Sequence, residues 1–346
     1  SGSVGRAIEI GADTLGATLV PMVVAAPQMR RYQCFGHLFA GMGDAVFRLD
    51  RHPVMARHPV TPMDEADVGM HVARQSGRLD TYLLSLEDLD RGSGLREVPE
   101  PDTGRLCAVS IDTVDAASDA AAGRAIWDAR ARSPLAIGSQ GVEYALVEHW
   151  CQSGKLDRVA PPAGIGRSKG MMSVSGSVSP TTAAQIAWSK ENGFVSIAFD
   201  ATQVCHGAAA IAGETARVVE ASLAALSEGR DPLVHTAEGP DDPAVARFRE
   251  EVAKTRTDMQ RANRSIGEAL GKILQTVLER SDTRRAVVSG GDTSGFATQQ
   301  LGIFALSALA PTIPGASIFR AHSDGPMDGL ELALKGGQMG SPDYVG

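Results

Sequence analysis

Residues 285–300, RAVVSGGDTSGFATQQ, constrain the fold of this chain more than any other stretch. A short apolar run at 286–288 meets the glycine pair Gly290-Gly291, and a helical pattern follows from Asp292. This order predicts a buried parallel strand, a tight turn and the start of a helix. The apolar positions of the predicted helix are Phe296, Leu301 and Phe304.

The turn in this stretch has the chemistry of a phosphate site. Glycines let the backbone turn sharply and let a ligand approach it closely. The first N–H groups of a helix have no partner within it and carry the positive end of its dipole. Asp292, Thr293 and Ser294 stand at the mouth, placed to orient a metal ion or a nucleophile. A capped turn without a ligand explains the stretch alone equally well, because GGDTSG matches no standard phosphate-loop motif.

Length and composition predict two globular domains. A chain of 346 residues is too long for one ordinary core. Its hydrophobic content of 43% and charged content of 21% are those of a soluble protein. The net charge of -8 argues against a nucleic-acid partner. No run is apolar enough for a membrane span and no signal sequence is seen, which predicts a cytoplasmic protein without a membrane partner.

The cysteines and histidines indicate no metal site. Four scattered cysteines without a C-x-x-C pair fit neither a disulfide framework nor a zinc site, and favour a reduced compartment. His52 and His58 are six residues apart on a segment that its prolines keep from forming a helix. That segment, 44–64, could form an anion-binding wall with Arg57 and His58, although composition alone favours a solvated loop.

The first half alternates strands and helices, which predicts a parallel sheet with right-handed crossovers. Ligands of such sheets bind beyond the carboxyl ends of the strands. Asp112 lies at such an end, where we interpret it as a helix cap. Strands are predicted at 17–25, 34–39, 106–112 and 135–141, and helices at 64–75, 85–89, 116–130 and 142–151.

A segment rich in glycine, proline and charge, 153–169, is the best domain boundary. It predicts a substrate-binding domain at 1–155, a linker at 156–169 and a nucleotide-binding domain at 170–346. Beyond it the alternation resumes, with no internal repeat. Strands are predicted at 171–176, 194–200, 232–236, 316–321 and 329–335, and helices at 181–192, at 213–227 and, as one long amphipathic helix, from the acidic segment 237–245 to about 280.

Three strand-end turns in the second half are rich in glycine and small hydroxyls: SGSVSPTT, GGDTSG and KGGQMG, at 175–182, 290–295 and 335–340. Together they fit a nucleotide held by backbone amides and hydroxyls. Lys335 either neutralises phosphate charge or faces solvent. Phosphoryl transfer needs cradled phosphates, Mg²⁺ and an acceptor hydroxyl in line, and Asp292 is the candidate for metal orientation or general base. A Ser-His-Asp hydrolase is disfavoured because no G-x-S-x-G elbow occurs.

These motifs resemble the four-carbon acid sugar kinase family over almost the whole chain. SGSVSPTTAAQI, VVSGGDTSG and LALKGGQMG resemble its nucleotide-binding domain, and GSVGRAIE, GHLF, HPVTPM and IGSQGVEYALV its substrate domain. The resemblance implies a two-domain α/β enzyme with largely parallel sheets and a cleft between the domains. It implies an ATP- and Mg²⁺-dependent kinase acting on the 4-hydroxyl of D-threonate, D-erythronate or 3-oxo-tetronate. The run RLDRHPVMARHPVTPM favours D-threonate.

The resemblance also implies which residues bind the nucleotide. They are Ser175, Gly176, Ser177, Gly290, Gly291, Asp292, Thr293 and Gly337. Adenine is expected between the first and third turns, and the phosphates near the second. The family's acidic D-D-x-T-G-A motif is absent, which suggests a missing N-terminal part, and KGGQMG replaces the usual K-S-G-N-F-G.

Two other functions stay open. One is a nucleotide-binding protein without catalysis. The other, an NAD oxidoreductase, is disfavoured because no G-x-G-x-x-G follows the first strand. A homo-oligomer is possible.

Overall fold

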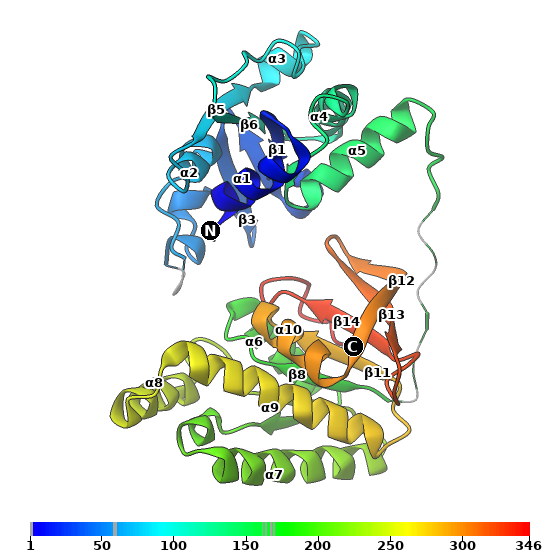
Figure 1. The fold of residues 1–346 in the computed structure, drawn as a ribbon. Coiled ribbons are helices and arrows are strands. Elements are labelled where there is room, and N and C mark those ends of the chain that lie inside the picture. The colour runs from blue at the N-terminus through cyan, green and yellow to red at the C-terminus, as the bar shows by residue number, and fades with distance from the viewer. Residues whose placement is uncertain (1–2, 58–60, 161, 163–164, 167, 169) are drawn as a thin grey trace. The chain divides into compact units, whose positions relative to one another are not determined.

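The computed structural model of the chain describes residues 3–57, 61–160, 162, 165–166, 168 and 170–346. The chain divides into two compact units, Ser1–Ala160 and Pro161–Gly346 (Figure 1). Each unit has its own sheets and hydrophobic clusters. Both are α/β, which confirms the predicted fold class.

The first unit is built on a parallel sheet of order β5-β6-β1-β7. β1 and β6 are buried at every position and apolar except at Ser110, as strands covered on both faces are. Helices α4 and α5 pack on one face, and α1 and α2 on the other. The bounds are α1 Val4–Leu15, β1 Leu19–Val23, α2 Val68–Ala73, β5 Leu79–Leu84, α3 Leu86–Asp90, β6 Leu106–Ile111, α4 Ala116–Ala129, β7 Ile137–Gly138 and α5 Gln140–Gln152.

A small antiparallel sheet, β2-β3-β4, accompanies the parallel one. The sequence predicted only an extended segment here, and it missed β5, whose charged and polar residues interrupt the apolar pattern. The bounds are η1 Pro27–Met29, β2 Arg31–Cys34, β3 His37–Met42, β4 Ala45–Arg48, η2 Leu49–Arg51 and η3 Met55–Arg57.

Asp112 is fully buried and is not the helix cap that the sequence suggested. Its carboxylate accepts hydrogen bonds from the N–H groups of Phe35 at 2.6 Å and Gly36 at 3.0 Å, and from the Gln33 amide at 3.1 Å. The cap of α4 is Asp115. Phe35, in the β2–β3 turn, has a φ of 48°. This left-handed backbone conformation is unfavourable for residues other than glycine unless contacts elsewhere in the fold stabilise it. Asp112 supplies that stabilisation by accepting hydrogen bonds from two N–H groups of the turn.

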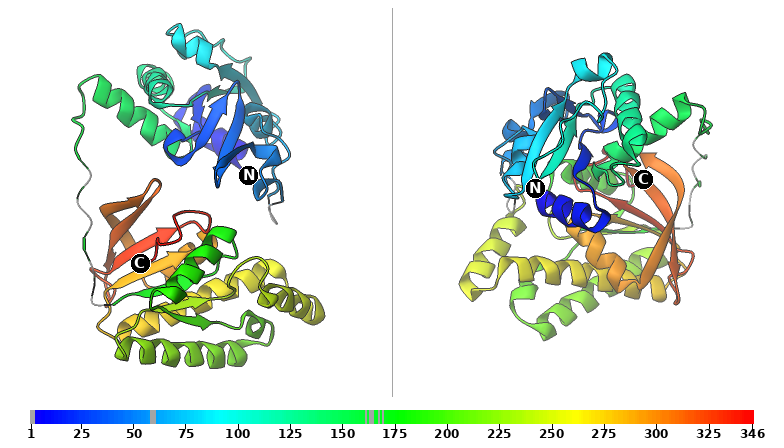
Figure 2. Two further views of the ribbon diagram at one scale, coloured as in Figure 1. Left: turned by 180° about the vertical axis from the view of Figure 1, so that it is seen from behind. Right: turned by 45° about the horizontal axis from the view of Figure 1, so that its top comes forward.

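The second unit is one mixed sheet of order β12-β13-β14-β11-β8-β10-β9 (Figures 1 and 2). The strands from β14 to β9 are parallel, and β12 and β13 add to the edge as an antiparallel hairpin. The bounds are β8 Met172–Ser175, β9 Val195–Ala198, β10 Pro232–His235, β11 Arg285–Ser289, β12 Ile303–Ile313, β13 Ala316–Ser323 and β14 Glu331–Lys335.

Helices cover the two faces of this sheet differently. The larger cluster packs α7 and α9 against one face, through residues such as Leu270 and Ile273. α6 covers the other face, where Ile186 packs on Leu233 with Tyr344 and Val345. The bounds are α6 Pro180–Glu191, η4 Ala201–Cys205, α7 Ala208–Ser227, α8 Pro243–Thr255, α9 Met259–Glu279 and α10 Gly291–Gln300.

Two expectations for this unit were wrong. The long helix ending near 280 is two helices, because Arg256 takes a left-handed conformation and Asp258 caps α9 by accepting from the Arg261 N–H. The predicted helix through Phe304 ends at Gln300, and Phe304 lies in β12 with 68% of its surface exposed. Within the described residues, no helix combines the length and apolar character needed to cross a bilayer.

Candidate functional site

The three glycine-rich turns lie side by side. β8, β11 and β14 are neighbours in the sheet, and Ser175, Ser289 and Lys335 stand in one row across their carboxyl ends. Side chains that share such a row in a parallel sheet point to the same face. Chain segments distant in the sequence therefore present their turns at one edge, where ligands of α/β sheets bind.

Close backbone contacts connect neighbouring turns. The Gly176 N–H donates to the Ser289 carbonyl at 3.1 Å, and the Gly290 N–H donates to the Lys335 carbonyl at 3.0 Å. A Cβ on Gly176 would lie 2.3 Å from Thr293 Oγ1. Glycine is required there because no side chain fits in that space.

The third turn is held against the first by hydroxyl groups. Thr182 Oγ1 donates to the Gly337 carbonyl at 2.8 Å and lies 3.1 Å from Ser177 Oγ. A Cβ on Gly337 would lie 2.0 Å from Ser177 Oγ. The Gln185 amide donates to the Met339 carbonyl at 2.9 Å. The predicted nucleotide residues of all three turns are thus brought together.

The start of α10 is an open donor site. Gly290 has a φ of 118°, and the first N–H groups of the helix have no partner within it. The Asp292 side chain is exposed in the first helical turn, and no hydrogen bond or ion pair holds it within the described part of the chain. A carboxylate placed in this way is free to contact a bound ligand.

Lys335 does not face solvent. It is 3% exposed, its Nζ donates to the Gly336 carbonyl at 3.2 Å, and its Nζ lies 5.7 Å from the centre of the Tyr344 ring. Burial lowers the pKa of this ammonium group to about 8. The sequence could not show this burial, because it depends on how residues 341–346 fold back.

The donors present fit a magnesium nucleotide. The described residues contain no cluster of three or more His, Cys, Asp or Glu side chains able to hold a metal alone. Mg²⁺ in phosphate sites uses one or two carboxylates together with phosphate oxygens and water. The single exposed Asp292 beside a helix start matches that requirement.

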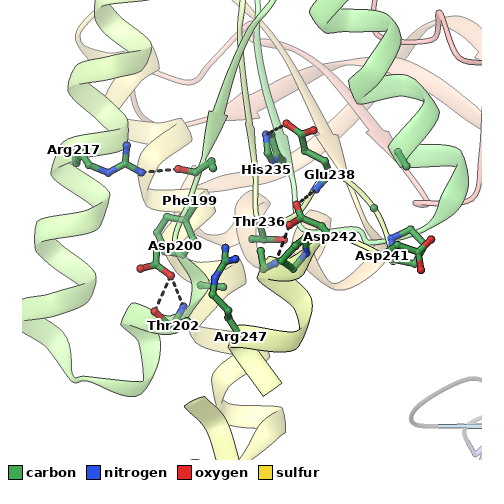
Figure 3. Close-up of a pocket in the computed structure, with 17 residues that line it drawn as sticks. Phe199, Asp200, Thr202, Arg217, His235, Thr236, Glu238, Asp241, Asp242 and Arg247 are labelled. Carbon is green, nitrogen blue, oxygen red and sulfur yellow. Dashed lines mark hydrogen bonds and ion pairs between the residues drawn. The ribbon is translucent and has the colours of Figure 1, made fainter. Parts of the chain in front are cut away.

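A second polar feature, missed from the sequence, is a cavity of about 820 Å³ at the carboxyl ends of β9 and β10 (Figure 3). Arg217 donates across its wall to the Ala198 carbonyl at 2.6 Å. His235 is buried, and burial lowers its pKa. The cavity borders the first turn, since the Thr236 N–H donates to the Ser175 carbonyl at 3.2 Å. Part of its wall comes from the acidic, proline-rich segment 237–245.

The candidate substrate residues of the first unit are less defined. Arg57 ends η3, and His58 lies outside the described residues. A buried group of the first unit that the sequence did not reveal is Asp119 of α4. Burial raises the pKa of Asp119 to about 6, against the hydrogen bond that it accepts from the Gln28 amide at 2.9 Å.

Two family models match the chain. A sugar-binding N-terminal domain matches residues 1–146, and a nucleotide-binding C-terminal domain matches residues 172–345. The second match contains all three turns.

Characterised relatives align over nearly the whole chain. The chain is 41% identical to a 3-oxo-isoapionate kinase of Paraburkholderia graminis, over 100% of the chain and 73% of that protein. It is 29% identical to a 3-oxo-tetronate kinase of Cupriavidus necator, and the alignment covers 99% of this chain and 74% of that protein. Solved structures from Salmonella typhimurium (TM-score 0.73, 20% identity) and Haemophilus influenzae (TM-score 0.61, 22% identity) share the fold, each over 99% of this chain and 76% of theirs.

Proposed function

Because the chain belongs to the four-carbon acid sugar kinase family, we propose that it transfers the γ-phosphoryl group of ATP to a hydroxyl of a 3-oxo sugar acid. The observation that carries this proposal is the convergence of three glycine-rich turns on neighbouring strands β8, β11 and β14. Backbone amides and small hydroxyls at such an edge hold phosphates without a Walker lysine loop.

The nucleotide is held by the second unit. Ser175, Gly176 and Ser177 contribute the first wall, residues 290–293 receive the phosphates at the start of α10, and Gly337 closes the third side. Glycines at these contacts let phosphate oxygens approach the backbone N–H groups. The acid is held by the first unit, for which Arg57 and His58 are the candidate anion ligands, consistent with the sugar-binding model that matches it.

Asp292 is the proposed general base. The acceptor hydroxyl oxygen bonds to the γ-phosphorus as the bond to the bridging oxygen of ADP breaks, and the hydroxyl proton passes to the Asp292 carboxylate. Mg²⁺, when bound, neutralises charge on the phosphate oxygens. The role of this chain in the step is to position the phosphates, exclude water and accept the proton.

The relatives favour an oxidised acid as the substrate. Both named relatives act on 3-oxo acids, whereas D-threonate, the substrate favoured by the Arg- and His-rich run, finds no support among them. We therefore place 3-oxo-isoapionate and 3-oxo-tetronate ahead of D-threonate and D-erythronate.

The test is a coupled ADP-release assay with ATP, Mg²⁺ and these four acids supplied singly. Turnover with one of the 3-oxo acids is the expected result. Turnover with D-threonate alone would reverse the substrate assignment. Heat stabilisation by ADP without turnover of any acid would favour the non-catalytic nucleotide-binding protein.

A further inference from the structure

We propose that Lys335 is a ligand of the nucleotide's phosphates, an inference that rests on the nucleotide site proposed above. Lys335 ends β14, directly before the third turn, and stands in the same cross-strand row as Ser289, which precedes Gly290. Lys335 thus places a positively charged side chain at the sheet edge where the three turns meet.

The first argument is that Lys335 has no counter-ion among the residues that the structure describes. Its described contacts are one carbonyl and one aromatic ring, and no charged neighbour contributes to the lowering of its pKa. A buried charge is normally paired, because removing an ammonium group from water is costly without an anion beside it. A carbonyl and the face of a ring offset only part of that cost.

The second argument is that the surroundings of Lys335 also lack partners. Ser289 Oγ is buried beside it in the register and accepts or donates no hydrogen bond within the described residues. Gln185 Oε1, on the buried face of α6, also has no hydrogen-bond partner among the described residues, although the Gln185 amide nitrogen holds the third turn. Buried polar groups of this kind are rare in folded proteins and call for an explanation.

The third argument is position. The neighbouring turns offer N–H groups and hydroxyls but no side-chain cation: the GGDT turn contributes a carboxylate, and the SGSVS turn only hydroxyls. A nucleoside diphosphate brings negative charge that backbone amides alone neutralise poorly. Lys335 supplies the missing charge from beneath the turns, as a compact point charge suited to phosphate.

The experiment compares Lys335→Met with Lys272→Met, a matched change of an exposed lysine on α9 that lies outside the proposed site. Calorimetry on the full chain measures binding of ADP and of adenosine, and thermal unfolding is measured without ligand. We expect Lys335→Met to weaken ADP binding by about 10-fold or more, the effect of losing a charge-assisted hydrogen bond. We expect Lys335→Met to bind adenosine as tightly as the wild type does. Lys272→Met should change neither ADP binding nor adenosine binding.

Thermal unfolding separates this role from a structural one. Methionine removes an unpaired buried charge while keeping the shape, so we expect the free variant to unfold no earlier than the wild type. ADP affinity equal to wild type, or equal losses for ADP and adenosine, would overturn the inference. If the wild type binds ADP but phosphorylates no acid, the kinase proposal fails while the Lys335 comparison still stands on ADP binding. If the wild type binds no ADP, both fail.

Discussion

Single glycines let the turns of the site pack closely, because a side chain at these positions would collide with a neighbouring turn. A Cβ at Gly176 would meet Thr293 Oγ1 at 2.3 Å, a separation that requires one of the two turns to move. We expect Gly176→Ala to weaken ADP binding by about 10-fold or more, since positioning contacts of this kind are sensitive to small shifts. Titration with ADP measures the loss. Gly213→Ala in α7, where nothing lies within 4 Å of the new Cβ, is the control and should bind ADP normally.

Substitution of Asp292 tests its proposed role as general base directly. We expect Asp292→Ala to lower turnover by about 10²–10⁴-fold, the usual contribution of a general base. The side chain is exposed and makes no described hydrogen bond, so thermal stability should not change. Steady-state kinetics and thermal unfolding check both statements, with the exposed Asp282→Ala as control. Unchanged turnover in the folded variant would remove Asp292 from the mechanism.

Asp119 makes the first unit sensitive to pH. Its pKa is raised to about 6 by burial, above the ordinary 3.8, so the folded state holds this proton more tightly than the unfolded state. The stabilising contribution of the protonated carboxyl is complete below about pH 4 and is lost as pH rises through about 6. The loss is at most about 3 kcal/mol for a shift of this size.

Asp119→Asn should remove that dependence. The amide oxygen can still accept from Gln28, and no charge forms at any pH. We expect the variant to be more stable than the wild type above pH 6 and similar to it near pH 4. Trp127 and Trp150, packed 5.2 Å apart in α4 and α5, report unfolding of this unit in a Trp188→Phe background. A stability difference between the variant and the wild type that does not grow between pH 4 and 6 would contradict the assignment.

At this scale the sequence predicted the three turns whose glycines and hydroxyls meet at one edge of the sheet, because each turn is a local pattern at the end of a strand. It could not predict the burial of Lys335 or Asp119, which is created by distant segments. Asp112 shows the same limit: its position at a strand end was foreseen, but its partners in the β2–β3 turn depend on the folded hairpin.

Among the elements, the break between α8 and α9 was the least visible in the sequence. Apolar periodicity continues across it and no glycine or proline marks it, yet Arg256 adopts a φ of 55°. Only Asp258, an N-cap residue, signals a new helix start. Strand β12 was hidden for a different reason: Phe296, Leu301 and Phe304 have a spacing that also fits one helix, and exposed apolar residues such as Phe304 give the strand no alternating pattern.

Arg256 therefore provides a test at the level of helix termini. Arg256→Gly should stabilise the second unit by about 0.5–1 kcal/mol, because glycine takes the left-handed conformation without a steric penalty. The exposed Arg249→Gly within α8 should destabilise it by about 1 kcal/mol. Chemical denaturation of both variants gives the comparison. Equal destabilisation by the two changes would show that the Arg256 conformation carries no strain.

For the molecule as a whole, alternation of strands and helices was enough to predict two α/β units. The order of strands within each sheet was not predictable, since it depends on which face each crossover takes. The hydrophobic clusters of the described residues stay within one unit or the other. Separate cores imply that each unit can unfold as its own cooperative step.

Calorimetry can test that separation. We expect two unfolding transitions, of which ADP raises only the one that belongs to Pro161–Gly346, because a ligand stabilises the unit that binds it. Tryptophan fluorescence in the Trp188→Phe background identifies the other, since Trp127 and Trp150 lie in the first unit. A single transition, raised as a whole by ADP, would show that the two units unfold together.

The pairing of β8 with β11 has a consequence for synthesis of the protein. Ser175 and Ser289 are hydrogen-bonded neighbours, yet β9, β10 and the helices from α6 to α9 are made between them. A nascent chain that ends before β11 can pair β8 with β10, but it still lacks the second and third turns. A chain under synthesis should therefore begin to bind nucleotide only once β11 and the following turns have left the ribosome. The onset of nucleotide binding would then show that this half of the chain has folded.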